Sequence, residues 1–459
     1  MDYAGATRYL ISLGNEIRAS ASDTVQKLGL GNITELLEDL ERPQEAYRSI
    51  LVAGTNGKGS AAAMLDAVLR AAGLRSGLYT SPHLVEINER IRVGGHPIPP
   101  AEFAELFSFL RSRIERLLAA GRLRYHPTYF ECLTAMGMEH FRRRKCDLAV
   151  LEVGMGGRLD ATNTAAACVS LLTEIDFDHE RFLGNTIAAI ASEKAGVIKP
   201  GAVVMSAASH PAAAAVIRAR AREQGARLVE VGREYFAEEV SLHEGQYSFL
   251  ACANNGPSLP VKLSLRGRHQ VENALAAVAG ARELARLGFP VSDADIQQGL
   301  ALAEWPGRLE LFRERPRVLL DGAHNPSAAR ALVRFWDENF PSRRLILVYG
   351  AMRDKAVQEI MEILFPKVSA VVLTRPEQFR AAAPETLREL SSHLSRNLVI
   401  EPAPAAALEA ALAMASDEDV IFVTGSLFLV GDIKRLCAPE AGGTDPLREQ
   451  PLLVPSGNR

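Results

Sequence analysis

The chain has 459 residues and a nearly balanced charge, with 52 Lys and Arg against 55 Asp and Glu, which gives a formal net charge of −3. Hydrophobic residues make up 47% and charged residues 23% of the chain, as is usual for soluble globular proteins. This length predicts two or three domains. The balanced charge argues against nucleic acid or a membrane surface as a partner, and no apolar run is long enough to span a bilayer.

The five cysteines are scattered along the chain and form no Cys-x-x-Cys pair. This pattern argues against a disulfide framework or a zinc site, and it is typical of a reducing compartment. The first residues show no charged-then-apolar signal pattern. We therefore expect a cytoplasmic protein.

Residues 1–48 are expected to be mostly helical. From residue 49 to about 210, short β-rich runs alternate with alanine-rich helical runs, which predicts parallel strands with helices on both faces of the sheet. The expected strands are Ser49–Ala53, Leu78–Thr80, Leu148–Val153, Ser170–Ile175 and Val203–Ser206.

The pattern then changes twice. Residues 228–266 are expected to form short antiparallel strands, and a long helix is expected from about Gln270 to Leu287. The turn-rich stretch Glu304–Arg308 predicts a domain boundary. Beyond it the alternation restarts as a smaller α/β unit, with expected strands at Val318–Leu320, Leu345–Tyr349, Ala370–Leu373, Leu398–Ile400 and Val420–Thr424. We therefore expect domains at 1–305 and 306–437, followed by a disordered tail at 438–459.

A glycine-rich stretch, Gly-Thr-Asn-Gly-Lys-Gly-Ser at residues 54–60, follows the first expected strand and precedes a helical run. Backbone N–H groups of such a loop and the N-terminus of the following helix bind phosphate oxygens, while a lysine neutralises their charge. The usual phosphate loop has its hydroxyl residue directly after the lysine. Here Gly59 separates Lys58 from Ser60, so the loop alone could also be a chance match.

Polar residues follow three other expected strands. Glu152 ends one of them and is followed by a loop of three glycines, Ser81 follows another, and His179 follows a third. Because ligands of open α/β sheets bind at the carboxyl ends of the strands, these side chains are candidate Mg²⁺ ligands beside a nucleotide. A structural glutamate and a surface histidine remain the alternatives. Lys194, in the next helix, could simply be a solvated lysine.

Eight segments occur in the order seen in folylpolyglutamate synthase and the bifunctional dihydrofolate synthase, which belong to the Mur ligase superfamily. They read VAGTNGKGS, TSPHL, TYFE, EVGMGGRLDATN, DFDH, SEKAGVIKPG, WPGR and DGAHNP. The resemblance extends to about residue 436. In this family the phosphate loop carries the late hydroxyl. The resemblance implies an α/β fold, with an N-terminal P-loop NTPase-like domain of the Mur ligase central type, a smaller C-terminal Rossmann-like domain and an active site between them.

The resemblance implies an ATP-dependent amide ligase that adds L-glutamate to a pterin or folate carboxylate through an acyl phosphate. ATP and Mg²⁺ are the implied cofactors, and a monomer is the implied state. Lys58 would contact the β- and γ-phosphates, Arg308 would contact a phosphate, and Asp321 would form a hydrogen bond with the ribose. The other implied nucleotide contacts are Gly54, Thr55, Asn56, Gly57, Gly59, Ser60, His269 and Asn273.

The implied metal ligands are Ser60, Ser81, Glu152, His179 and Lys194. Lys194 matches a lysine that is carbamylated in the family, and carbamylation requires a neutral amine and hence a lowered pKa.

Two further binding regions follow from the motifs. Asn325 and Pro326 are expected to open a helix as N-cap and first helical residue, so an anion beside His324 would be stabilised by the helix N-terminus. His324 and Ser426 match the family's glutamate-binding positions, although capping without a ligand is the alternative. Residues that match the border of the pterin pocket are Phe130, as a stacking surface, with Asp160, Ala161 and Thr162.

Three functions stay open at this point. The first is the ligase described above, either bifunctional or extending tetrahydrofolate alone. The second is a Mur-type ligase acting on a cell-wall precursor, although only about 48 residues precede the first strand, which is short for the extra domain such enzymes carry. The third is a nucleotide-binding module without ligase chemistry, which would need neither Lys194 nor Arg308.

Overall fold

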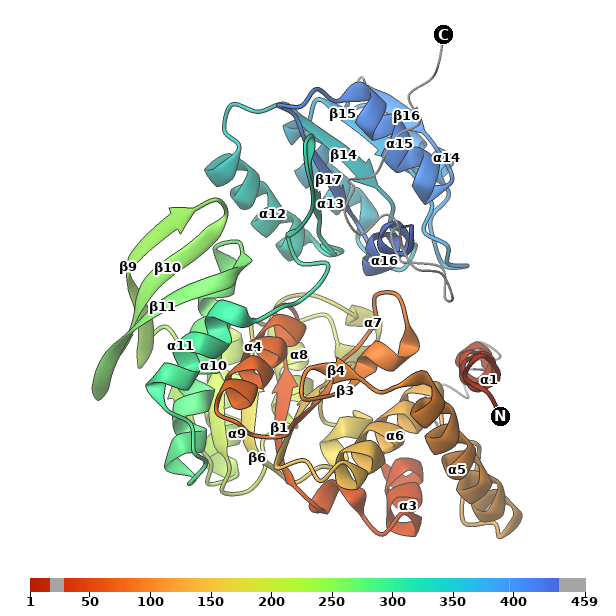
Figure 1. Cartoon of the computed structure of the whole chain (residues 1–459), viewed down its shortest axis with the longest axis vertical. Coiled ribbons are helices and arrows are strands. Elements are labelled where there is room, and N and C mark those ends of the chain that lie inside the picture. Colours follow the sequence, from red (N-terminus) through yellow and green to blue (C-terminus); the bar gives the residue numbers. More distant parts are fainter. Residues whose placement is uncertain (17–28, 396, 437–459) are drawn as a thin grey trace. The chain divides into compact units, whose positions relative to one another are not determined.

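The computed structural model describes residues 1–16, 29–395 and 397–436. The chain forms two compact units (Figure 1). The first contains residues 1–242, 247–264 and 269–304, and the second contains residues 243–246, 265–268 and those from 305 onward. The tail expected at 438–459 lies outside the described residues, as does part of the helical region expected before residue 48.

An eight-stranded sheet forms the centre of the first unit, with the strand order β4-β3-β2-β5-β1-β6-β7-β8. The pairs from β2 to β8 are parallel, whereas β3 and β4 are antiparallel to their neighbours. The strands are β1 Arg48–Ala53, β2 Ser76–Tyr79, β3 Ile91–Val93, β4 His96–Pro97, β5 Leu148–Glu152, β6 Ala167–Leu172, β7 Val203–Ser206 and β8 Arg227–Glu230.

Both faces of this sheet are covered. Leu51 and Ala53 of β1 point into a core shared with α1, α3, α5 and α6, and the alternating residues Ile50 and Val52 are buried on the opposite face. On that face α4 packs against α10 and α11. The helices of this unit are α1 Tyr3–Glu16, α3 Gly31–Asp39, α4 Lys58–Ala71, α5 Pro100–Ala119, α6 Tyr129–Arg143, α7 Glu180–Leu183, α8 Ile187–Ala195, α9 Pro211–Glu223, α10 His269–Arg286 and α11 Asp293–Leu302.

A separate three-stranded sheet, drawn in green in Figure 1, contains β9 Tyr235–His243, β10 Gln246–Ala253 and β11 Gly256–Arg266. Two-residue connections join these strands, so consecutive strands are antiparallel, as the sequence predicts. The start of this region was predicted wrongly, because Arg227–Glu230 is the parallel edge strand β8 of the large sheet. The short strands β3 and β4 were also missed.

The second unit contains a six-stranded sheet with the order β12-β13-β17-β14-β15-β16. All its pairs are parallel except β12 with β13. The strands are β12 Glu310–Glu314, β13 Arg317–Leu320, β14 Leu345–Tyr349, β15 Ala370–Leu373, β16 Leu398–Ile400 and β17 Val420–Thr424. The helices are α12 Pro326–Asn339, α13 Val357–Leu364, α14 Pro384–Ser391, α15 Pro404–Met414 and α16 Leu427–Arg435.

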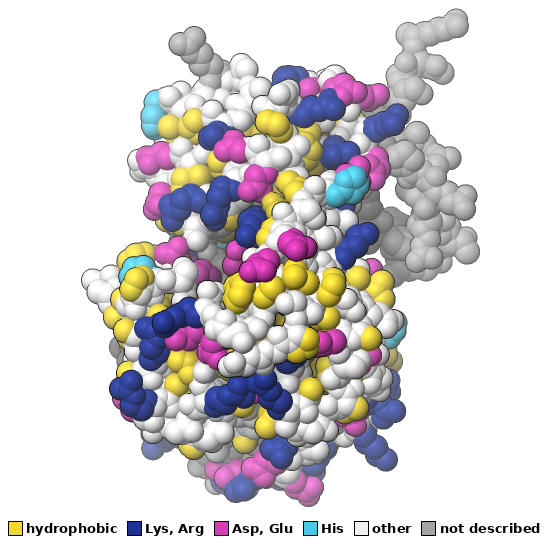
Figure 2. All heavy atoms as spheres, turned by 90° about the vertical axis from the view of Figure 1, so that its left-hand side faces the viewer, with side chains coloured by type: hydrophobic (Ala, Val, Ile, Leu, Met, Phe, Trp, Pro, Cys, Tyr) yellow, Lys and Arg dark blue, Asp and Glu magenta, His cyan; other side chains and the backbone are white. Residues whose placement is uncertain are grey.

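Two observations bear on the partners that the sequence predicts or excludes. On the face shown in Figure 2, Lys and Arg side chains are interspersed with Asp and Glu side chains. No helix in the described part of the chain is both long and apolar enough to cross a membrane.

Candidate functional site

Four neighbouring strands of the first unit end at one edge of the sheet. In the order β2-β5-β1-β6, Ser81 follows the first strand, Glu152 is the last residue of the second, the loop that begins at Gly54 follows the third and the segment 173–179 follows the fourth. Because the four strands are parallel, their carboxyl ends meet at the same edge, which is where ligands bind in open α/β sheets. The fold therefore brings together residues that lie up to 125 positions apart, from Gly54 to His179.

The glycine-rich loop adopts a conformation that depends on its glycines. Gly57 has a φ of 85°, and a Cβ at this position would lie 2.2 Å from Oδ1 of Asn273 in α10. A Cβ on Gly54, where φ is 149°, would lie 1.9 Å from Oγ1 of Thr173. Larger residues would clash at both positions, so the loop can approach its neighbours only with glycine there.

Hydrogen bonds hold the loop against the neighbouring strand end. The N–H of Thr55 donates to the carbonyl of Glu174 at 2.8 Å, and the Thr55 hydroxyl donates to the carbonyl of Asp176 at 2.9 Å. Lys58 Nζ donates to the carbonyl oxygens of Gly54 and Thr55, both at 3.1 Å. The loop therefore presents a lysine ammonium and the N-terminus of α4 at the edge of the sheet, a combination that suits phosphate.

The side of the loop that meets α10 is polar. Gln270 Nε2 donates to Oγ of the buried Ser60 at 3.3 Å, and Asn273 Nδ2 donates to Oε1 of Gln270 at 2.9 Å. His269 is the first residue of α10. Gln270 was missed by sequence reasoning, although its place between the two predicted residues His269 and Asn273 could have indicated it.

Glu152 and Ser81 meet across the pair β5–β2. The backbone N–H of Ser81 donates to Oε2 of Glu152 at 3.0 Å, and Glu152 is only 4% exposed. A buried carboxylate beside a hydroxyl residue is a suitable donor set for Mg²⁺.

His179 occupies the N-cap position of α7 with a φ of 51°, and its Nε2 lies 3.7 Å from Oδ2 of Asp178. Asp178 is a second carboxylate at this edge that was not predicted, although it stands directly before His179. Within the described ranges, no three His, Cys, Asp or Glu side chains are grouped closely enough to hold a metal ion by themselves. An ion at this edge would therefore need hydroxyl, phosphate or water ligands as well, as Mg²⁺ commonly has.

Lys194, in α8, contacts the same loop. Its side chain is buried, with 4% exposure, and Nζ donates to the carbonyl of Gly54 at 2.6 Å. Burial, assisted by repulsion from Lys58, lowers the pKa of Lys194 from 10.5 to about 7. A substantial fraction of this amine is therefore neutral near pH 7, so it can act as a nucleophile toward carbon dioxide.

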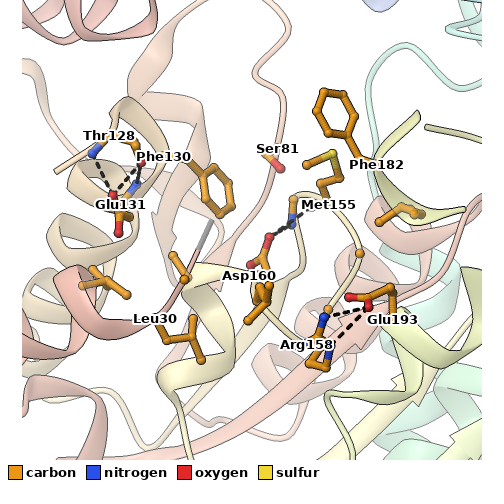
Figure 3. A pocket seen from close by; sticks show the side chains of 18 of the residues that line it. Leu30, Ser81, Thr128, Phe130, Glu131, Met155, Arg158, Asp160, Phe182 and Glu193 are labelled. Carbon is orange, nitrogen blue, oxygen red and sulfur yellow. Dashed lines mark hydrogen bonds and ion pairs between the residues drawn. The ribbon is translucent and has the colours of Figure 1, made fainter. Parts of the chain in front are cut away.

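A cavity of about 490 Å³ lies beside this edge and includes Ser81 and Phe130 in its lining (Figure 3). Its walls are mainly apolar, with Leu30, Ile33, Met155 and Phe182 among them. A cavity of this size and character suits a small flat organic ligand.

Asp160 lines the cavity, but its carboxylate already accepts bonds from the backbone N–H groups of Gly154, Met155 and Thr162, each at 3.0 Å. Burial raises the pKa of Asp160. Ala161 also lines the cavity, whereas Thr162 is fully buried and its hydroxyl donates to Asp160. Thr162 therefore lies behind the cavity wall.

The second unit carries its own group of predicted residues at the ends of the paired strands β13 and β17. Asp321 accepts from the N–H groups of Leu309 and Ala323 at 3.0 and 2.9 Å. Burial raises the pKa of Asp321, and the charge of Arg308 opposes that shift. Arg308 lies against Gly322, because a Cβ on Gly322 would come within 2.3 Å of the Arg308 Nη1 atom.

His324 and Ser426 lie at helix N-termini in this unit. Nδ1 of His324 is 2.8 Å from the carbonyl of Gly322, which can only accept, so Nδ1 carries a proton. Asn325 caps α12, as predicted, by accepting from the N–H of Ala328 at 2.9 Å. Ser426 caps α16 by accepting from the N–H of Phe428 at 3.1 Å. Both N-termini can stabilise an anion.

Comparison with known proteins places the chain among amide ligases. Residues 108–281 match the Mur ligase middle domain, and residues 307–427 match the Mur ligase glutamate ligase domain. The chain is 36% identical to the folylpolyglutamate synthase of Lacticaseibacillus casei over 404 residues, which covers 88% of this chain and 93% of that protein.

Solved structures agree with this placement. A folylpolyglutamate synthase from Mycobacterium tuberculosis complexed with ADP is 31% identical, with a TM-score of 0.87 over 95% of this chain and 99% of the other. Escherichia coli FolC in complex with DHPP and ADP is 31% identical, with a TM-score of 0.82 over 95% of this chain and 98% of the other.

Proposed function

Because the chain belongs to the folylpolyglutamate synthase and dihydrofolate synthase family of Mur ligases, we propose that it uses ATP to join L-glutamate to the carboxylate of a pterin or folate. One observation carries this proposal. A glycine-rich loop, a buried carboxylate and a buried lysine of lowered pKa share one edge of the sheet, beside a largely apolar cavity.

The reaction needs ATP because a carboxylate is a poor electrophile. Its charge repels a nucleophile, and its leaving group would be oxide. Transfer of the γ-phosphoryl group to the carboxylate forms an acyl phosphate and releases ADP. The α-amine of glutamate then attacks the acyl carbon, phosphate leaves, the amine loses a proton and an amide remains. Such a reaction depends mainly on positioning and on neutralising phosphate charge.

Lys58 and Arg308 supply positive charge in this proposal. Lys58 Nζ donates to two carbonyl oxygens of the loop at 3.1 Å, so its ammonium lies at the loop that would hold the β- and γ-phosphates. Arg308 would stabilise phosphate charge, and Asp321 would accept from the ribose. His269 and Asn273 would contact the base, with Gln270 supporting Asn273.

The residues present fit Mg²⁺, with Glu152 as the buried carboxylate ligand and Ser60, Ser81 and His179 as further ligands. A bound Mg²⁺ would neutralise charge on the transferred phosphoryl group. Lys194 would contribute as a carbamate, since its lowered pKa leaves an amine that reacts with carbon dioxide. Lys194→Ala should lose activity and regain part of it with acetate or formate, whereas full activity of this variant would exclude the role.

Glutamate is the second substrate in this proposal. The N-terminus of α12, next to His324, and the N-terminus of α16, capped by Ser426, would hold its carboxylates. Phe130 would stack on the pterin ring inside the cavity of Figure 3, with Asp160 and Ala161 along its edge.

The test is an ADP-release assay with ATP, Mg²⁺ and glutamate, in which dihydropteroate and tetrahydrofolate are compared as acceptors. Release that requires both glutamate and an acceptor supports the ligase. Release with both acceptors would show a bifunctional enzyme, and release with tetrahydrofolate alone a monofunctional one. ADP release that neither acceptor nor glutamate changes would instead favour a nucleotide-binding module.

We also propose that the protein acts as a monomer in the cytoplasm. The described cysteines Cys132, Cys146, Cys168 and Cys252 are free thiols, which suits a reducing compartment. Size-exclusion chromatography with light scattering should give the mass of one chain, 49.7 kDa.

A further inference from the structure

Five charged residues line the cavity, and the four that are labelled in Figure 3 form an ion pair or accept two or more hydrogen bonds within the protein. Arg158 pairs with Glu193, from its Nε and Nη2 atoms, at 3.1 and 2.9 Å. Glu131 accepts from the N–H and hydroxyl of Thr128 at 2.8 Å each. Asp160 accepts from the surrounding N–H groups. The fifth is Arg90.

Arg90 is a buried cation whose contacts are all neutral. It is 7% exposed, and its Nε donates to Nδ1 of His83 at 2.9 Å. Because Nδ1 accepts this bond, it carries no proton, and the His83 ring is therefore neutral. The guanidinium carbon lies 5.3 Å from the centre of the Tyr129 ring. Across residues 1–16, 29–395 and 397–436, no carboxylate forms an ion pair with Arg90.

An unpaired buried charge is costly, so its persistence points to a ligand of opposite charge. A guanidinium binds a carboxylate through two parallel hydrogen bonds more strongly than it binds neutral groups. The other contacts of Arg90 use Nε and one face of its plane, which leaves the outer edge of the guanidinium as the part suited to such a bond.

The backbone holds Arg90 at the edge where the reaction is proposed to occur. Arg90 directly precedes β3, and Ile91 of β3 pairs with Tyr79 at the end of β2. The carbonyl of Arg90 accepts from the N–H of Thr80 at 3.0 Å, directly before Ser81. Both Arg90 and Ser81 line the cavity.

We propose that Arg90 binds the carboxylate of the acceptor in this cavity. This inference rests on the proposed function, because it names the charged contact of the pterin or folate that the site would take. Two carboxylates have the required chemistry. One is the benzoate carboxylate of dihydropteroate, and the other is the α-carboxylate of the glutamate in a reduced folate.

The experiment measures binding by isothermal titration calorimetry, with the full chain in Mg²⁺ and ADP. The probes are dihydropteroate, its carboxamide and tetrahydrofolate. Wild type should bind dihydropteroate about ten- to a hundred-fold more tightly than the carboxamide, as expected for a charge-assisted hydrogen bond. In Arg90→Gln this ratio should fall to about one to three, while the affinity for the carboxamide should change little.

Arg92→Gln is the matched control, because Arg92 lies two residues further on and does not line the cavity. It should keep the wild-type ratio. Arg90→Lys keeps the charge but loses the planar pair of donors, so its ratio should be intermediate. Far-UV circular dichroism checks that each variant is folded. If Arg90→Gln does not fold, the ratio of the two affinities in Arg90→Lys tests the inference instead.

Tetrahydrofolate identifies the carboxylate. If Arg90→Gln weakens the binding of dihydropteroate alone, Arg90 binds the benzoate carboxylate. If it weakens the binding of both dihydropteroate and tetrahydrofolate, Arg90 also binds the glutamate α-carboxylate. Either result supports the inference. Equal affinity of wild type for the acid and the carboxamide would overturn it. Equal weakening of both by Arg90→Gln would also overturn it, in favour of a packing role. Wild type that binds none of the three probes would overturn the proposed acceptor itself and this inference with it.

Discussion

Lys194→Met should remove a pH dependence from the stability of the first unit. The side chain of Lys194 is 4% exposed, and burial with repulsion from Lys58 lowers its pKa from 10.5 to about 7. Between these two pH values the unfolded chain binds one proton more than the folded chain. The free energy of unfolding therefore rises with pH in this window, and the penalty of the buried charge is fully present below pH 7.

The size of the effect follows from the pKa shift. The full penalty is about 5 kcal/mol, because one pKa unit corresponds to about 1.4 kcal/mol. Between pH 7 and pH 9 wild type should gain about 2 kcal/mol from Lys194 alone. Methionine has similar length and no charge, so this gain should vanish in Lys194→Met, although the variant loses the hydrogen bond to Gly54, worth about 1 kcal/mol.

The assay is urea unfolding followed by far-UV circular dichroism at several pH values, in buffers free of carbon dioxide so that no carbamate forms. Lys262→Met is the matched control, since Lys262 is an exposed lysine on β11 of the same unit. The control should keep the wild-type slope of stability against pH. A Lys194→Met variant with that same slope would refute the burial argument and, with it, the reason for expecting a reactive amine.

Three further predictions concern the two strand-end sites. Glu152→Gln keeps the size of the buried residue and removes its charge, so the Mg²⁺ concentration needed for ADP to raise the melting temperature should increase about ten-fold or more; an unchanged Mg²⁺ titration would argue against a metal role. Gly322→Ala should cost about 1–3 kcal/mol in urea unfolding and should lower turnover, because the new Cβ would lie 2.3 Å from both Nη1 of Arg308 and Cδ2 of Leu427; wild-type values for both would contradict the close packing. Asn325→Ala should destabilise the second unit by about 1 kcal/mol, because the cap on α12 is lost. Asn325→Asp keeps a capping oxygen, so its free energy of unfolding should stay near that of wild type. Both values can be measured from the fluorescence of Trp305 and Trp336 during urea unfolding.

The sequence alone was sufficient for most of the strands and for the place of the glycine-rich loop between β1 and α4. Val203–Ser206 and Leu345–Tyr349 have the predicted bounds, because a short apolar run between turn signals is a local pattern. The loop at Gly54 was recognisable because its glycines stand directly between an apolar run and a helical run. The resemblance of eight ordered segments then indicated the family that the comparisons show.

The short strands β3, β4 and β12 could not be read in this way. None of them is an uninterrupted apolar run, because their sequences are Ile-Arg-Val, His-Pro and Glu-Leu-Phe-Arg-Glu. Their pairing with a neighbouring strand, rather than a pattern of their own, makes them strands. Arg227–Glu230 was mistaken for the same reason, since only its pairing with β7 distinguishes a parallel edge strand from the antiparallel strands that follow.

The tertiary structure decided which strand ends are neighbours. The order β2-β5-β1-β6 differs from the order along the chain, because long-range hydrogen bonding and burial select each strand's partners. Only that order places Ser81 against Glu152. Burial is likewise a property of the folded chain. The pKa of Lys194 is lowered only because the surrounding side chains exclude water from its amine. The charge of Arg90 is buried without an ion pair only because the fold encloses it and bonds the nearby acidic groups to other partners.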